Sequence, residues 1–168
     1  MIVESVSARR ELLARTKTVA IVGASPNPLR PSYTVFSYLR TQTPFAIAPI
    51  NPKIAEIDGV KAYRSLAAYA AECGPPDVVD VFRRPSEALT VAREAAACGA
   101  KAIWFQYGII NPKAIEYADR AGLDVVVDRC IKVEFARMNG GLATSGLNSG
   151  TITSKRFSRW PPQRHGDA

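Results

Sequence analysis

Residues 17–32 constrain the fold more than any other part of the chain. The segment has at 18–22 a short apolar run rich in β-branched residues, which is typical of a buried strand. Gly23 and a group of turn-forming residues follow, with Pro31 suited to a first helical turn, and an amphipathic segment runs from Tyr33 to Leu39. A strand, a tight turn and a helix in this order predict the first crossing of an open α/β sheet, where a helix N-terminus can bind a phosphate group.

Strands and helices are expected to alternate along the rest of the chain. Four further strands are predicted, at 45–50, 77–82, 102–105 and 123–127, with a short extended piece at 57–63. Helices are predicted at 3–15, 31–41, 65–73, 86–98, 112–121 and 131–138. The strands are continuous apolar runs, as in a parallel sheet covered on both faces. The chain is therefore expected to form a single Rossmann-like α/β domain of about five parallel strands in the order 3-2-1-4-5, with helices on both faces.

Composition limits the class of protein. A chain of 168 residues with 47% hydrophobic and 22% charged residues is typical of one soluble globular domain. No segment approaches the roughly 20 apolar residues of a membrane span, and residues 1–17 lack the apolar block of a signal peptide, so we expect a cytoplasmic location. Cys73, Cys98 and Cys130 show no CxxC spacing, which favours reduced thiols over disulfides or a zinc site.

The end of the chain differs from the rest. Residues 139–154 are rich in Gly, Ser, Thr and Asn, and residues 155–168 are basic. We therefore predict a domain at 1–138 and a tail at 139–168 that is either disordered or docked on a neighbouring subunit, which leaves a homodimer open. The net charge of +7 favours anionic partners, although the strand-end pattern described next does not require a nucleic acid.

Polar and basic residues follow the carboxyl ends of the predicted strands, the edge at which this architecture binds ligands. In chain order they are Gly23, Ala24, Ser25 and Arg30; Asn51, Pro52 and Lys53; Arg83, Arg84 and Pro85; Gln106, Tyr107 and Gly108; and Asp128, Arg129 and Cys130. Lys or Arg follows four of these strands. An edge with this much positive charge predicts a polyanionic ligand.

The end of the second strand helps to distinguish the candidate nucleotides. An NAD site places Asp or Glu there, roughly 20 residues after the glycine turn, to bind the ribose hydroxyls. This chain has Asn51, Pro52 and Lys53 instead, and Lys53 can pair with a phosphate on the ribose. The turn also has Gly23 alone in place of the three glycines of G-x-G-x-x-G. These departures count against NAD and leave NADP and coenzyme A (CoA) open.

Five segments together resemble a known family. They are residues 22–33, 50–53, 79–83, 102–109 and 127–134, and in this order they look like the successive blocks of the small stand-alone CoA-binding proteins. These proteins are similar to the N-terminal CoA-binding domain of the succinyl-CoA synthetase alpha subunit, and the resemblance covers about residues 17–137. The resemblance implies a CoA site made of three groups of residues. Gly23, Ala24, Ser25 and Arg30 would bind the pyrophosphate, and Asn51, Pro52 and Lys53 would bind the adenosine end with its 3′-phosphate. Phe82, Arg83 and Gly108 would form the neighbouring wall.

Few residues suggest catalysis. Ligases that carry this domain pass a phosphoryl group through a histidine, but the single histidine here is His165, in the basic tail. Cys130, at a strand end, has two possible roles. As a nucleophile, its pKa can be lowered by Arg129 and by the start of the following helix, which would permit a disulfide with a CoA thiol. Alternatively, Cys130 is a buried packing residue. Asp80, in mid-strand, is expected to pair with one of the arginines that follow the strand ends.

The leading hypothesis is a protein that binds CoA or a short acyl-CoA without catalysis of its own, in a carrier, sensor or regulatory role. The alternative is an NADP-dependent oxidoreductase that uses the same site, with Tyr107 as proton donor. A third reading assigns nucleic-acid or protein binding to the basic tail.

Overall fold

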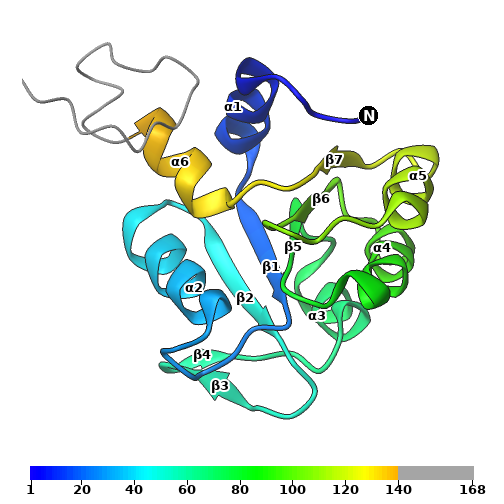
Figure 1. Ribbon diagram of the computed structural model, residues 1–168. Helices are drawn as coiled ribbons and strands as arrows, with labels where there is room; N and C mark the ends of the chain where they lie inside the picture. Colours follow the sequence, from blue (N-terminus) through cyan, green and yellow to red (C-terminus); the bar gives the residue numbers. More distant parts are fainter. Residues whose placement is uncertain (140–168) are drawn as a thin grey trace, which may run out of the picture.

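A five-stranded parallel sheet lies at the centre of the protein, and its strands follow the order β2-β1-β5-β6-β7 (Figure 1). The structure is a computed structural model that describes residues 1–139. The strands are β1 (Thr18–Val22), β2 (Ala46–Ile50), β5 (Val78–Val81), β6 (Ala102–Phe105) and β7 (Asp124–Val126). The predicted Rossmann-like α/β fold is confirmed, whereas the predicted tail at 139–168 lies almost wholly outside the described residues.

Helices cover both faces of the sheet (Figure 1). One face carries α1 (Val6–Arg15), α2 (Pro31–Gln42) and α6 (Ile131–Asn139). The other face carries α3 (Leu66–Cys73), α4 (Ala88–Ala97), which follows the 3₁₀ turn η1 (Pro85–Glu87), and α5 (Pro112–Arg120). Alternate strand residues enter two separate cores: Ile21 and Trp104 pack on the first face, and Val22 and Phe105 pack on the second. Burial on both faces explains why the strands are continuous apolar runs.

The predicted strand order 3-2-1-4-5 is wrong. The third strand of the sheet along the chain, β5, pairs with β1 through Val19↔Val78 to Val22↔Val81, which places β2 at an edge. Pro49 in β2 accounts for this position, because proline has no N–H to donate to a second neighbouring strand. On the outer side of β2, the Pro49 carbonyl accepts a hydrogen bond from the backbone N–H of Tyr63, a loop residue, at 2.9 Å. Pro49 is therefore a signal in the sequence that β2 is an edge strand.

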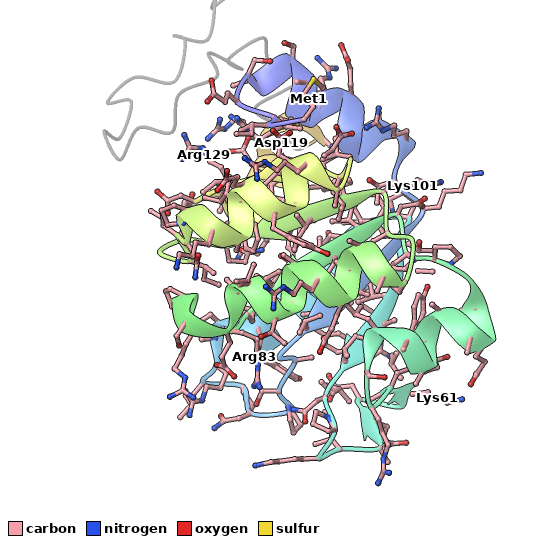
Figure 2. All side chains as sticks on the ribbon, turned by 90° about the vertical axis from the view of Figure 1, so that its right-hand side faces the viewer. Met1, Lys61, Arg83, Lys101, Asp119 and Arg129 are labelled. Atoms are coloured by element: carbon pink, nitrogen blue, oxygen red, sulfur yellow. The ribbon has the colours of Figure 1, made fainter. Side chains whose placement is uncertain are left out.

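The predicted helix over 3–15 begins only at Val6. Ser5 is its N-cap, and the Ser5 Oγ accepts a hydrogen bond from Ala8 N at 3.1 Å. The preceding residues are extended along β7, where Val3 N donates to Val125 O and Val125 N donates to the Met1 carbonyl, both at 2.8 Å. Figure 2 shows Met1 near Asp119, which its amino group contacts at 2.9 Å. These contacts cover the exposed edge of β7.

The hairpin of β3 (Glu56–Ile57) and β4 (Val60–Lys61) lies between β2 and α3. The hairpin follows the carboxyl end of β2. Just after the hairpin, Tyr63 forms an isolated β-bridge with Ile50 at the end of β2. The hairpin therefore returns Arg64 and Ser65 to the edge of the sheet at which the candidate site is found.

Candidate functional site

Two adjoining cavities lie at the carboxyl ends of β1, β2, β5 and β6, where the sequence predicts the ligand. The larger has a volume of about 660 Å³ and is lined by Gly23, Ala24, Ser25, Arg30, Pro31, Ser32, Val35, Asn51, Phe82, Arg83, Arg84, Gln106, Tyr107, Ile109 and Cys130. The smaller has a volume of about 240 Å³ and is lined by Val22, Gly23, Ile50, Asn51, Pro52, Arg64, Ser65, Arg83, Glu87, Thr90, Val91 and Glu94. Gly23, Asn51 and Arg83 line both, so the cavities meet at these residues, and we call the two together the groove.

Gly23 allows three strand ends to meet closely at this junction. Its N–H donates to Ile50 O of β2 at 3.1 Å, while Phe82 N, just past β5, donates to Val22 O at 2.8 Å. Gly23 has a φ of +86°, and a Cβ at this position would lie 2.4 Å from the Phe82 carbonyl oxygen. Both the backbone conformation and the close approach therefore require glycine.

The N-terminus of α2 faces the larger cavity and offers donors for an anion. Arg30 is the N-cap and makes no side-chain capping bond, and Pro31 opens the helix. Within residues 1–139, no hydrogen bond uses the N–H groups of Ala24, Ser25 or Ser32. Unused donors beside a helix N-terminus and the Arg30 side chain form a site suited to a phosphate group.

Asn51 fixes the two loops that meet at the junction. Its Nδ2 donates to the Ala24 carbonyl at 2.7 Å, and its Oδ1 accepts from Lys53 N at 2.9 Å. This side chain therefore links the turn after β1 to the turn after β2. It has a structural role at the position where an NAD site would carry a carboxylate.

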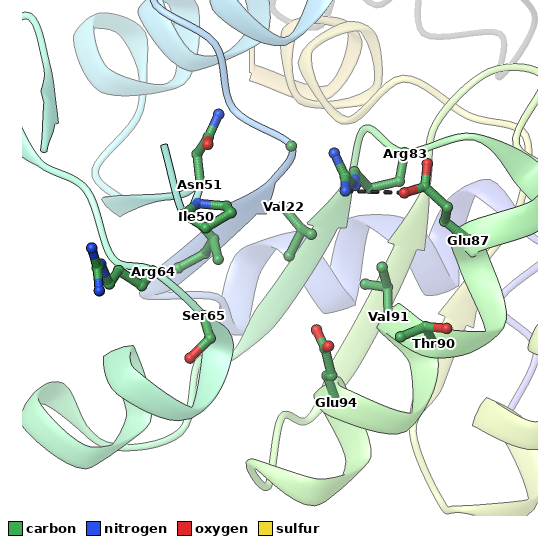
Figure 3. A pocket seen from close by; sticks show the side chains of 12 residues that line it. Val22, Ile50, Asn51, Arg64, Ser65, Arg83, Glu87, Thr90, Val91 and Glu94 are labelled. Atoms are coloured by element: carbon green, nitrogen blue, oxygen red, sulfur yellow. Dashed lines mark ion pairs between the residues drawn. The ribbon is translucent and has the colours of Figure 1, made fainter. Parts of the chain in front are cut away.

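Arg83 stands on the opposite side of the junction. Its guanidinium pairs with Glu87 at 3.0 Å, and Figure 3 shows this pair on one side of the smaller cavity, across from Asn51. Arg84 pairs with the same carboxylate at 3.2 Å and, together with Arg83, lowers the pKa of Glu87. Two guanidinium groups share one carboxylate, so a net positive charge remains for a ligand.

A buried carboxyl group lies beneath the larger cavity. Asp80, in the middle of β5, is fully buried, and its Oδ1 accepts a hydrogen bond from Gln106 Nε2 at 2.6 Å. The predicted arginine partner is wrong, because Arg83 and Arg84 lie beyond the end of β5 and pair with Glu87 instead. Burial raises the pKa of Asp80 to about 7, although the hydrogen bond from Gln106 opposes the shift.

Cys130 lines the larger cavity but is not an activated thiol. Burial raises its pKa, and the nearby Asp80 raises it further. Of the two alternatives, activation finds no support. Burial outweighs the backbone N–H groups of the helix start, which lower the pKa, and the Arg129 Nη1 donates to the Asp128 carbonyl at 2.7 Å. The structure therefore favours the alternative of a buried packing residue.

Thiol reactivity tests this assignment. In single-cysteine variants we expect the exposed Cys73 to react with an aromatic disulfide reagent at least about ten times faster than Cys130 at pH 7.5, because the thiolate is the reacting species and Cys130 is shielded. The release of the coloured thiol measures both rates, and the unfolded variants serve as controls with equal rates. Faster reaction at Cys130 would restore it as a nucleophile.

Most of the predicted site residues line the groove. Gly23, Ala24, Ser25, Arg30, Asn51, Pro52, Phe82, Arg83 and Gln106 line one or both cavities. Lys53 and Gly108 line neither, and the Gly108 N–H donates to Asp128 Oδ1 at 2.9 Å. Lys53 is exposed beside the smaller cavity, next to Pro52.

Sequence reasoning missed a second group of lining residues. Ser32, Val35 and Ile109 belong to the larger cavity, and Arg64, Ser65, Thr90, Val91 and Glu94 belong to the smaller one. Ser32 and Val35 follow the glycine turn in the first turns of α2, so the helix-start argument could have included them. The residues of the smaller cavity carry no comparable signal, because packing of α4 and the hairpin brings them to the groove.

Family comparison agrees with this geometry. The profile of a family described as a CoA binding domain matches residues 17–136. The chain belongs to this family. The predicted resemblance to small CoA-binding proteins is thereby confirmed. Within residues 1–139, the CoA-binding-domain protein has no helix with the length and apolar character to cross a membrane and no cluster of His, Cys, Asp and Glu suited to a metal ion.

Relatives of similar size share the whole domain. The uncharacterized protein YneT of Bacillus subtilis is 39% identical over 127 residues, which cover 76% of this chain and 91% of YneT. A solved structure of a hypothetical protein from Pyrococcus horikoshii has a TM-score of 0.74 at 37% identity and covers 82% of this chain and 94% of that one.

The alpha subunit of ADP-forming acetate–CoA ligase II from Pyrococcus furiosus is 24% identical over 122 residues, but the match covers only 27% of that subunit.

Proposed function

We propose that this CoA-binding-domain protein binds CoA or a short acyl-CoA along the groove and acts as a carrier, sensor or regulator without catalysis of its own. The observation that carries the proposal is the groove itself. Two cavities of different character meet at Gly23, and unused backbone donors and arginine side chains surround the junction. CoA has matching parts, because its pyrophosphate joins an adenosine 3′-phosphate to a long pantetheine arm.

The pyrophosphate is assigned to the junction. The N–H groups of Ala24, Ser25 and Ser32 provide donors there, and Arg30 provides a full charge at the N-terminus of α2. Arg83 is able to exchange its exposed pairing with Glu87 for a phosphate oxygen, because surface ion pairs contribute little stability.

The adenosine is assigned to the smaller cavity. Val22, Ile50 and Val91 offer apolar surface for the base, and Glu94 offers a carboxylate that can accept hydrogen bonds from the adenine amino group (Figure 3). Lys53 is exposed beside this cavity, within the adenosine end that the family resemblance implies. We assign the 3′-phosphate to Lys53 on that basis.

The pantetheine arm is assigned to the larger cavity. Val35, Phe82 and Ile109 give this cavity an apolar wall, and Gln106 and Tyr107 add polar groups. An arm that contains two amides needs this mixture of apolar surface and a few hydrogen-bonding groups. The volume of about 660 Å³ also leaves space for a short acyl group on the sulfur.

Lys53 provides a direct test of the ligand. We expect CoA to bind about ten times more tightly than dephospho-CoA in calorimetric titration, because an ion pair with the 3′-phosphate is lost. In Lys53→Gln the two affinities should become similar. The matched control is Lys17→Gln, since Lys17 is exposed at the opposite end of β1 and loses the same charge.

Two outcomes would contradict parts of the proposal. Equal affinity of the wild-type protein for CoA and dephospho-CoA would remove the role assigned to Lys53. Binding of NADPH without binding of CoA would favour the NADP-dependent oxidoreductase, for which Tyr107 is the available phenol because it lines the larger cavity and is half-exposed.

A further inference from the structure

The hydrogen bond between Gln106 and Asp80 connects the floor of the larger cavity to a group that no ligand can reach. Gln106 lines the cavity, whereas Asp80 is fully buried beneath it. The 2.6 Å bond from Gln106 Nε2 to Asp80 Oδ1 uses one carboxyl oxygen, and the other, Oδ2, is buried without a hydrogen-bond partner. Buried carboxyl groups are costly, so a group kept in mid-strand under a cavity calls for an explanation.

The carboxyl group determines which atom of the amide faces the ligand. An ionised carboxylate accepts hydrogen bonds and cannot donate them, so the Gln106 amide must direct its nitrogen toward Asp80. The carbonyl oxygen, Oε1, is then the amide's acceptor toward the cavity. Among the described residues, no group donates a hydrogen bond to this oxygen.

We propose that Asp80 is a positioning residue, which holds the Gln106 amide so that its carbonyl oxygen accepts a hydrogen bond from an amide N–H of the pantetheine arm. This inference rests on the proposed function and deepens it. It makes Gln106 the group that recognises the arm, while Asp80 acts only through Gln106. The nucleotide half of the ligand does not depend on either residue.

The charged groups on this face leave Asp80 free to act in this way. The Asp80 side chain lies on the face covered by α1, α2 and α6, as do its strand neighbours Ile21 and Trp104. The Cys130 thiol is a titratable group on this face whose pKa the charge of Asp80 raises. Other charged groups on these helices have partners away from Asp80. Arg9 and Arg137 pair with Glu134, Arg15 pairs with Asp124, Lys132 lies over the Tyr38 ring, and Arg40 donates to the Asp58 carbonyl.

Protonation of Asp80 is expected to weaken this selection. A neutral carboxyl group has an O–H that can donate to Gln106 Oε1, so the amide can turn and present its NH₂ to the cavity. Burial places the pKa of Asp80 at about 7, so both forms exist between pH 6 and 8. Affinity for the pantetheine arm should therefore fall as the pH falls through this range.

Calorimetric titration with two probes isolates the arm. CoA contains it, whereas adenosine 3′,5′-bisphosphate lacks it and carries the same 3′-phosphate, so the ratio of the two affinities reports mainly the arm. At pH 8 we expect this ratio to fall about 10-fold in Gln106→Met and about 5-fold in Asp80→Asn, as for the loss of one hydrogen bond. In Gln106→Met, the added Asp80→Asn change should have no further effect. Bisphosphate binding shows that each variant is folded.

The pH dependence of the affinity ratio separates a positioning role from a merely structural role, because a structural role would not make the ratio depend on pH. From pH 8 to pH 6 the affinity ratio should fall about 3-fold more in the wild-type protein than in Asp80→Asn, in which any change reflects only protonation of the 5′-phosphate of the bisphosphate, whose second pKa is about 6. An equal loss of affinity for both probes, or the same Asp80→Asn effect with and without Gln106, would overturn the inference and leave the proposed function intact. Failure of CoA to bind the wild-type protein would overturn both.

Discussion

Replacing Gly23 by alanine is expected to weaken CoA binding by more than about 100-fold and to lower the free energy of unfolding by about 3 kcal/mol. The left-handed conformation at φ +86° costs a non-glycine residue about 1–2 kcal/mol. The new Cβ would also lie 2.4 Å from the backbone oxygen of Phe82, and backbone cannot move aside as a flexible side chain can. The strand ends must separate, which displaces the donors of Ala24 and Ser25 from the junction.

Gly59→Ala is the matched control. Gly59 has a similar φ of +77°, but nothing lies within 4 Å of the position that its Cβ would take. We expect this variant to lose only about 1 kcal/mol and to keep its CoA affinity. Chemical denaturation and calorimetric titration measure both quantities. If Gly23→Ala behaved like Gly59→Ala, the close approach of the strand ends would not matter for binding.

Replacing Asp80 by asparagine is expected to remove a strong pH dependence of stability. The pKa of Asp80 is about 7 in the folded protein against a model value of 3.8, so the folded state binds more protons than the unfolded state between these values. Stability therefore falls as the pH rises through this window. One pKa unit corresponds to about 1.4 kcal/mol, so the full loss above pH 7 amounts to about 4 kcal/mol.

Unfolding by denaturant at pH 5 and pH 8 tests this prediction. The free energy of unfolding of Asp80→Asn, relative to the wild-type protein, should rise by about 2–3 kcal/mol between the two pH values. An asparagine NH₂ without a hydrogen-bond partner would lower the stability of Asp80→Asn equally at both pH values. The change in the relative free energy of unfolding between pH 5 and pH 8 therefore does not depend on it. Asp77→Asn is a control whose effect should be the same at pH 5 and pH 8. Hydrogen bonds from Lys101 and from backbone N–H groups together outweigh burial and lower the pKa of Asp77, so this carboxyl group is ionised in the folded and unfolded protein at both pH values. A pH-independent effect of Asp80→Asn would show that burial does not raise the pKa of Asp80 above its unfolded value.

The sequence was sufficient for the parts of the site that lie next to each other along the chain. Gly23, Arg30 and the start of α2 follow one strand within a few residues, and turn and helix-start preferences act over that distance. The same reasoning failed for Asp80, because the partner of a buried carboxyl group is decided by the neighbouring strand. Gln106 follows β6, and only the pairing of β5 with β6 places its amide at Asp80.

What the sequence by itself determined is the set of elements and the positively charged carboxyl edge, because strand periodicity, turn residues and helix starts are local properties of the chain. What only the tertiary structure decided is the order of the strands and therefore which strand ends are neighbours. Pro49 indicates in the sequence that β2 is an edge strand, but only the tertiary structure shows that β5 is the other neighbour of β1. The hairpin and α4 then bring Ser65 and Glu94 together into the smaller cavity. Such contacts between distant segments depend on packing of the whole domain, which no local pattern encodes.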